Sequence, residues 1–171
     1  MVTGTLRLVC LDEGRSNKNK YNETPDSYAS LMMRHLLLLC IAQRNMAANH
    51  WTQELVRFYK DFMRHITKNN TNLPYNKNLY NDTKEKWDEY YEKAKKDARM
   101  EREEINNPIY FDLIPEKCPW TIDHFIKIPL GTLVMISQDV IQGKRYYGID
   151  EALYRLQKGY GSYDNDRREN W

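Results

Sequence analysis

The sequence has few of the residues that build disulfide frameworks, metal knuckles and phosphate loops. Its 171 residues include only 3 Cys and 7 Gly. The cysteines Cys10, Cys40 and Cys118 are odd in number and widely spaced, which argues against disulfides and against a Cys-x-x-Cys metal site. No Gly-rich phosphate-binding motif is present. We therefore expect no cofactor and no metal site, although a zinc site assembled from distant positions stays open.

Long hydrophobic runs are also absent. The longest one, residues 36–42, is far too short to span a bilayer. The first ten residues, MVTGTLRLVC, carry one Arg and a short apolar run before Asp12 and Glu13, which is not the pattern of a signal peptide. With cysteines that favour a reducing compartment, these absences lead us to expect an intracellular protein, cytoplasmic or mitochondrial.

Neither sign of charge dominates the chain. Lys and Arg number 26 against 24 Asp and Glu, so the formal net charge of +2 creates no global field toward nucleic acid. Hydrophobic residues make up 41% and charged residues 29%, which is typical of a folded globular chain. This length and composition predict one domain with a sizeable core.

The first half of the chain shows helical periodicity. Residues 27–43 are apolar nearly all round, which predicts a helix in the middle of the core. Asn49 is a plausible cap for a second helix. The buried face of that helix recurs at helical spacing and comprises Leu55, Phe58, Tyr59, Phe62, Met63 and Ile66.

Residues 82–85 resemble a capping box and predict the start of the longest helix, which would reach residue 105 or so. Its expected buried stripe comprises Trp87, Tyr90, Tyr91, Ala94 and Ala98. On its outer face, Glu89 with Lys93 and Glu92 with Lys96 are favourable pairs one helical turn apart.

The second half of the chain has a less regular pattern, with shorter predicted elements. Three prolines, at 108, 115 and 119, predict an extended connector, after which Thr121 opens a short helix over 121–126. Thr132 is a plausible cap for a segment ending at Gly143, helical or stranded, and residues 150–158 predict a last helix. We expect an all-α fold, a small multi-helix bundle of helical hairpins with extended tails. The predicted divisions are an N-terminal extension (1–25), a helical core domain (26–127) and a C-terminal helical extension and tail (128–171).

Several of these segments together resemble a known family. RHLLLL (34–39) precedes a polar, partly basic loop that closes on Trp51, and the helix WDEYYEKAKKDAR and the segment PEKCPWTIDHFI (115–126) follow. Over residues 30–127 this order resembles the bacterial domain of unknown function 29, common in cyanobacteria. The resemblance implies an all-helical fold and no particular activity. The residues before 30 and the tail from 128 to 171 have no counterpart in it.

The most specific part of the resemblance, PEKCPWT, has a physical interpretation as a latch. Two prolines hold the chain extended, and Trp120 is a large apolar anchor. Cys118 can serve as a small hydrophobic residue, and Thr121 can cap the next helix. The alternative is a reactive Cys118 with His124 as its base, for which no third orienting group is evident.

One short motif suggests catalysis. RNMAANH (44–50) contains Arg44 and His50, and ribonucleases of the HEPN class carry an Arg followed within a few residues by a His. Chance produces such pairs readily in a chain of this composition. In an unbroken helix, six positions turn about 600°, which leaves the two side chains about 120° apart. A loop and helix start is therefore the preferred interpretation, and a nuclease is the alternative.

A second short motif suggests nucleic acid. GKRYYG (143–148) combines bases and aromatics that can stack on single strands, and its candidate contact residues are Lys144, Arg145, Tyr146 and Tyr147. A helical chain with polar tails and without a catalytic constellation favours a different function. We expect no enzyme but a non-catalytic interaction module, a structural or accessory subunit of a larger, possibly mitochondrial, assembly whose other proteins hold both tails. The alternatives are the HEPN-type ribonuclease and a small RNA-binding accessory protein.

Overall fold

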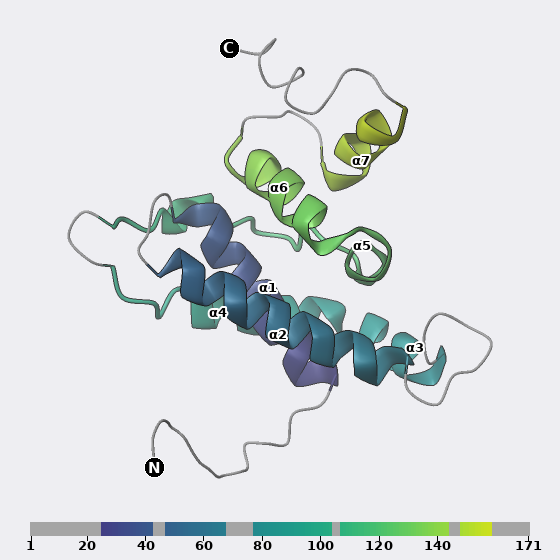
Figure 1. Ribbon diagram of the computed structural model, residues 1–171. Helices are drawn as coiled ribbons and strands as arrows, with labels where there is room; N and C mark the ends of the chain where they lie inside the picture. Colours follow the sequence, from purple (N-terminus) through teal and green to yellow (C-terminus); the bar gives the residue numbers. More distant parts are fainter. Residues whose placement is uncertain (1–24, 43–46, 68–76, 104–106, 144–147, 159–171) are drawn as a thin grey trace.

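The computed structural model describes residues 25–42, 47–67, 77–103, 107–143 and 148–158 (Figure 1). Within these ranges the chain is all-α and contains no strand, which confirms the predicted class. The elements are α1 (Pro25–Ile41), α2 (Ala48–Thr67), α3 (Lys77–Glu85), α4 (Trp87–Ala98), the 3-10 helix η2 (Phe111–Leu113), α5 (Ile122–Lys127), α6 (Leu130–Ile141) and α7 (Ile149–Lys158). The predicted N-terminal extension (1–25) lies outside the described residues apart from Pro25.

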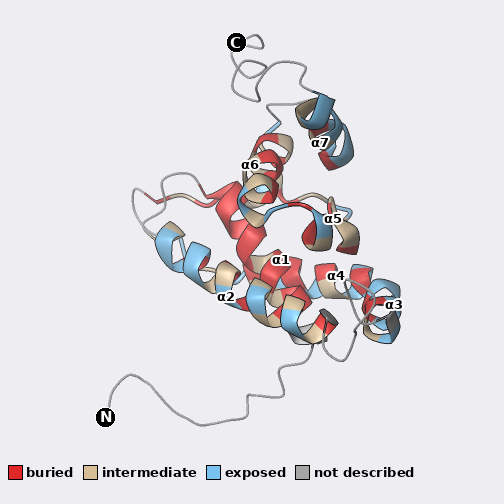
Figure 2. Cartoon of the chain, turned by 45° about the vertical axis from the view of Figure 1, so that its right-hand side comes forward, coloured by how far each residue is buried: buried red, intermediate tan, exposed pale blue. Residues whose placement is uncertain are grey.

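Helix α1 is the centre of the core, as its uniformly apolar sequence predicted. It packs against α2, α4 and α6, and Figure 2 shows it buried along almost its whole length. Among its residues, Met32, Leu36 and Leu37 have no exposed surface. A helix that is apolar on all sides is stable only when neighbours cover every face, and here three helices do so.

Helix α2 covers one side of α1 with the predicted face. Leu55, Phe58, Phe62 and Ile66 are buried, and Tyr59 and Met63 are partly buried. The expected cap was wrong, because Asn49 lies inside the first turn. The helix instead begins at Ala48, where the carbonyl before it, that of residue 47, accepts the N–H of Trp51 at 2.9 Å.

The expected capping box at 82–85 was also wrong. These residues end α3, and α4 starts two residues later at Trp87 and ends at Ala98, so α2 with its 20 residues is the longest helix described. Thr83 is 1% exposed and faces the core, where its hydroxyl does not cap α4. Tyr80, Thr83 and Trp87 form one buried face. The packing of this face, rather than the local capping preference of residues 82–85, determines where the helix breaks.

Within α4 the predicted stripe is confirmed, with Tyr90 partly buried and the other four residues buried. The charged pairs differ from those expected. Glu92 pairs with Lys95 at 2.9 Å, and Lys93 pairs with Asp97 at 2.9 Å. Glu92 therefore pairs with the buried Lys95 and not with Lys96.

Helix α6 closes the end of α1. The last carbonyls of a helix have no hydrogen-bond donor within the helix, and side chains of α6 donate to those of α1. Gln138 Nε2 donates to the Leu39 carbonyl at 3.1 Å, and Gln142 Nε2 donates to that of Cys40 at 2.8 Å. The segment is helical throughout and starts at Leu130, so Thr132 lies inside the helix and is not its cap. Gly143 ends it with φ of +74°, as predicted.

His35 lies on α1 as a satisfied core residue. It is 5% exposed, and its Nδ1 lies 2.7 Å from the Leu31 carbonyl, to which it donates. Burial lowers the pKa of the imidazole below its usual 6.5, and Arg34 lowers it further, against opposing contributions from that hydrogen bond and from Glu54. The folded protein therefore favours the neutral ring.

This lowered pKa makes stability dependent on pH. Below about pH 6.5 the unfolded chain binds a proton at His35 that the folded chain resists, so stability is full above that pH and falls as the pH drops from there toward the folded pKa. We expect the urea midpoint of the wild type to fall between pH 7 and pH 5.5, and His35→Asn, which keeps a donor but does not titrate, to show a shallower fall. The control is His65→Asn near the end of α2. Equal slopes in the wild type and His35→Asn would contradict the prediction.

Candidate functional site

The extended segment 115–120 is held against α4 by that helix's own side chains. Tyr91 Oη donates to the Pro115 carbonyl at 2.6 Å, and Lys95 Nζ donates to that of residue 116 at 2.8 Å. Trp87 Nε1 donates to the carbonyl of Trp120 at 2.9 Å. An extended strip without a strand partner needs such bonds for its backbone, so the predicted latch has a physical mechanism.

Trp120 is the anchor of this latch, as predicted. It is 2% exposed, and its Nε1 donates to Ser137 Oγ on α6 at 2.8 Å. Its ring meets Tyr91 and Phe125 edge to face, with centroids 6.2 and 6.0 Å apart. One side chain therefore joins α4, α5 and α6.

The start of α5 is a reciprocal cap. Thr121 Oγ1 accepts the backbone N–H of His124 at 3.2 Å, and the Thr121 N–H donates to His124 Nδ1 at 3.0 Å. Because Nδ1 accepts, the ring proton is on Nε2, which donates to Asp150 Oδ1 on α7 at 2.6 Å. Asp150 is thus the orienting partner that the sequence did not reveal, since 26 residues separate it from His124.

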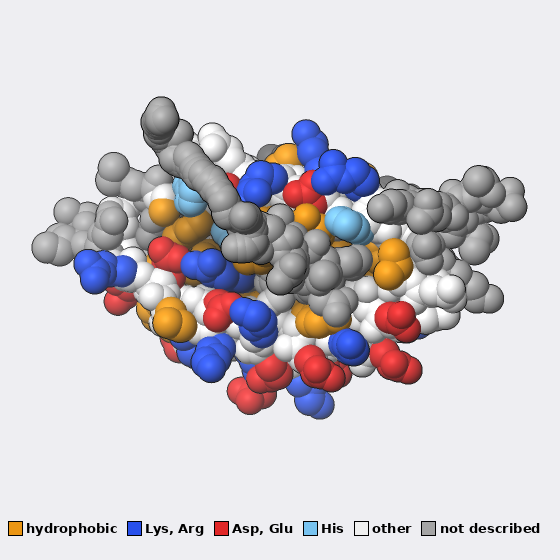
Figure 3. Space-filling view, turned by 90° about the horizontal axis from the view of Figure 1, so that it is seen from below, with side chains coloured by type: hydrophobic (Ala, Val, Ile, Leu, Met, Phe, Trp, Pro, Cys, Tyr) orange, Lys and Arg blue, Asp and Glu red, His pale blue; other side chains and the backbone are white. Residues whose placement is uncertain are grey.

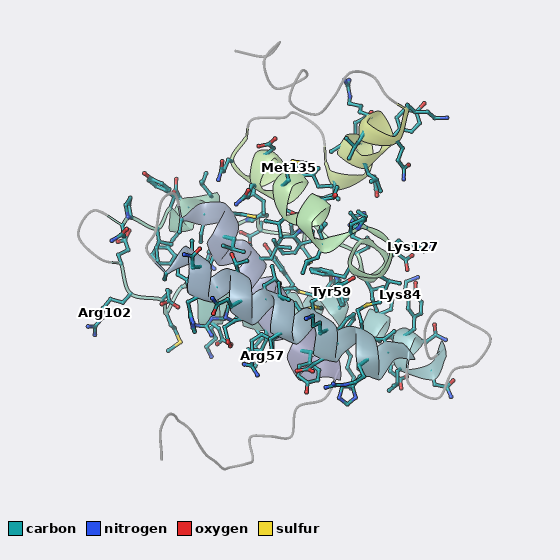
Figure 4. The ribbon with its side chains drawn as sticks, in the orientation of Figure 1. Arg57, Tyr59, Lys84, Arg102, Lys127 and Met135 are labelled. Carbon is teal, nitrogen blue, oxygen red and sulfur yellow. The ribbon has the colours of Figure 1, made fainter. Side chains whose placement is uncertain are left out.

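A groove of about 670 Å³ lies beside this cap, between α3, α4, α5 and α7. Its walls are largely apolar and its rim is charged. The lining residues are Lys84, Trp87, Asp88, Cys118, Trp120, Thr121, Ile122, Asp123, His124, Lys127, Ile128, Asp150 and Leu153. Figure 4 shows Lys84 and Lys127 on the same side of the molecule, near α5. A volume of this size suits a ligand or several side chains of a partner.

A second hollow of about 470 Å³ adjoins the groove along α4 and shares Asp88 and Cys118 with it. It is also lined by Tyr91, Glu92, Glu116 and Lys117. In the following paragraphs, "the groove" means both hollows together. None of its charged residues was a candidate from the sequence, because they come from α3, α4, the 115–120 segment, α5 and α7, which only the fold brings together.

Cys118 lies in the groove wall but is not activated. Its Sγ donates to the Trp120 carbonyl at 3.2 Å, and burial raises the pKa of the thiol to about 12. His124 does not offer a base to it, because one ring nitrogen accepts the Thr121 N–H and the other donates to Asp150. The structural interpretation of Cys118 is therefore favoured over a Cys–His pair.

The raised pKa predicts slow alkylation of Cys118. With a pKa of about 12, the thiolate fraction at pH 8 is on the order of 10⁻⁴, against roughly a quarter for an ordinary cysteine. We expect iodoacetamide to label Cys118 in the native protein about a thousandfold more slowly than in the unfolded chain. Peptide mass spectrometry assigns the label to each cysteine. Native labelling of Cys118 at the unfolded rate would contradict the prediction.

The other predicted site residues are only partly described. His50 is exposed in the first turn of α2, and Arg44 lies outside the described residues, so the structure does not bring this pair together or separate it. The basic-aromatic candidates Lys144, Arg145, Tyr146 and Tyr147 also lie outside them. Across the described ranges, no three His, Cys, Asp or Glu side chains are grouped to hold a metal ion.

Figure 3 shows acidic and basic side chains interspersed on one face of the molecule. On α2, for example, Arg57 pairs with Glu54 at 2.8 Å and Arg64 pairs with Asp61. Such alternation gives no field of a single sign over that helix. None of the described helices is both long enough and apolar enough to cross a membrane.

The fold and groove define an all-helical domain, in the part of the chain that the structure describes, whose extended segment 115–120 is held against α4 and α6. The chain belongs to the family described as domain of unknown function DUF29, whose model matches residues 12–128. The match begins nearer the N-terminus than the resemblance in sequence suggested, and it ends before α6. No curated protein and no solved structure matches the chain.

Proposed function

We propose that this domain is a non-catalytic helical interaction module, a structural or accessory subunit of a larger protein assembly, with a mitochondrial complex as one setting. The observation that carries this proposal is the state of the groove's polar groups. Those on Cys118, Thr121 and His124 are all held in hydrogen bonds within the chain. They shape the groove without offering a nucleophile or a base.

Such a groove is suited to binding because it is already formed. The Trp120 anchor, the Thr121 cap and the bond to Asp150 fix its walls before a partner arrives, so little side-chain ordering remains to oppose association. An apolar wall with a charged rim is also the usual arrangement of a protein interface, with a buried centre and a polar edge.

The test is photo-crosslinking in the protein's own cells. A benzophenone amino acid replaces Lys127 on the groove rim in one variant and Lys60 on the exposed face of α2 in the control. We expect the Lys127 variant to give one defined protein adduct that co-migrates with a native assembly much larger than 20.6 kDa. A native mass of a monomer or simple dimer, with no adduct specific to Lys127, would contradict the proposal.

The two alternative functions, a ribonuclease and an RNA-binding accessory protein, predict different experimental results. A HEPN-type ribonuclease requires RNA cleavage by the purified protein that is lost in Arg44→Ala with His50→Ala. An RNA-binding accessory requires salt-dependent RNA binding that weakens in Lys144→Ala with Arg145→Ala. If neither activity is present while the native assembly is, the interaction module stands.

A further inference from the structure

We propose that the groove binds a cationic stretch of a partner protein, a segment bearing Arg or Lys, with Asp88 as its principal anion. This deepens the proposed function and rests on it. The inference combines the balance of charge around the groove, the one carboxylate that both hollows share, and the apolar wall beneath it.

Carboxylates outnumber cations around the groove. Five carboxylates line it, namely Asp88, Glu92, Glu116, Asp123 and Asp150, against three lysines, Lys84, Lys117 and Lys127. Buried Lys95 pairs with Glu92, so the excess around the groove is one negative charge, five carboxylates against four lysines. A partner segment that carries positive charge is therefore attracted to the groove during approach and oriented by it once bound.

Asp88 is the carboxylate best placed to receive that partner. Asp123 accepts the Tyr80 hydroxyl at 2.7 Å and lies 4.0 Å from Lys127, and Asp150 accepts from His124. Asp88 lines both hollows and, among the described residues, makes no hydrogen bond or ion pair. It is therefore an exposed carboxylate, shared by the two hollows, whose pairing is left to a ligand.

Asp88 also has a simple structural role, and the chain provides a control for it. Asp88 and its neighbour Glu89 both lie in the first turn of α4, where an anion stabilises a helix N-terminus. Glu89 lines neither hollow. If Asp88 were only a helix-terminal charge, Asp88→Asn and Glu89→Gln would behave alike.

The wall beneath Asp88 suits the stem of a long basic side chain. Trp87, Trp120, Ile122 and Leu153 supply apolar surface below the charged rim. Lys and Arg bury their methylene stems on such surface while the charged head stays near an anion. Lys84, in the last turn of α3, lines the same hollow as Asp88, so its ammonium repels a cationic ligand.

Binding of two labelled peptides tests the proposal. The first carries six arginines, and the second replaces them with citrulline, which has the same shape without the charge. Fluorescence anisotropy is measured with the full-length protein and with Asp88→Asn, Glu89→Gln and Lys84→Gln. Unfolding curves of each variant establish that all are folded.

We expect the arginine peptide to bind and the citrulline peptide to bind at least tenfold more weakly. Asp88→Asn should weaken arginine-peptide binding by about threefold to tenfold, Glu89→Gln should leave it unchanged, and Lys84→Gln should strengthen it about twofold to threefold. Equal binding of the two peptides, equal losses in Asp88→Asn and Glu89→Gln, or weaker binding in Lys84→Gln would overturn the proposal.

The native assembly separates failure of this inference from failure of the proposed function. If the crosslinked assembly persists in cells while arginine peptides do not bind, the interaction module stands and the cationic partner is wrong. If the assembly is absent and the purified protein still binds arginine through Asp88, the groove is a peptide site outside any stable complex.

Discussion

Replacing Trp120 by alanine is expected to lower the free energy of unfolding by about 3–5 kcal/mol, the usual cost of truncating a buried Trp. Its indole fills the junction of α4, α5 and α6, where the rings of Tyr91 and Phe125 pack against it. Alanine would leave a cavity there, and the Ser137 hydroxyl would lose its partner. Because small domains have only about 5–15 kcal/mol of stability, we expect a large fall in the denaturation midpoint.

Two further variants divide this loss into packing and hydrogen bonding. Trp120→Phe keeps an aromatic ring but removes the indole N–H, so it should cost less than alanine. Ser137→Ala keeps the indole but leaves its buried N–H without an acceptor, at a cost of about 1–3 kcal/mol. A loss below about 1 kcal/mol in Trp120→Ala would show that the latch is not part of the cooperative core.

A chain that ends at residue 128 is expected not to fold, although it contains the whole segment matched by the family. Removing α6 exposes the core around Leu133 and Ile136, which are completely buried, and around Ile141. Each such side chain contributes about 1.5–3 kcal/mol, so the loss is at least about 5 kcal/mol and reaches the scale of the total stability. The carbonyls of Leu39 and Cys40 would also lose Gln138 and Gln142.

The matched control is a chain that ends at Gly143, which lacks α7 alone among the described helices. That helix buries just Ile149 and Ala152, so we expect this chain to fold with reduced stability. Circular dichroism and urea titration compare the two truncations with the full chain. Cooperative unfolding of the shorter chain would contradict the prediction and would support a domain boundary at 127/128, which otherwise stays a prediction.

The sequence predicted the elements whose stability depends on their own spacing. Residues of α1 are apolar on all sides, and those of α2 recur every three or four positions, so both helices and their buried faces followed from the 3.6-residue period. The cap at Thr121 and the anchor at Trp120 were also predictable, because both depend on residues close in the chain. The sequence alone therefore determined the all-α class, the central helix and the latch.

Tertiary structure decided the helix boundaries and the groove. Core packing from Tyr80 to Trp87 moved the break between α3 and α4, and a preceding carbonyl replaced the expected cap at Asn49. The bond from His124 to Asp150 spans 26 residues, and that from Gln142 to Cys40 spans 102. Helical period specifies which face of a segment is buried, but such distant pairs and the carboxylates of the groove meet only through the path of the whole chain.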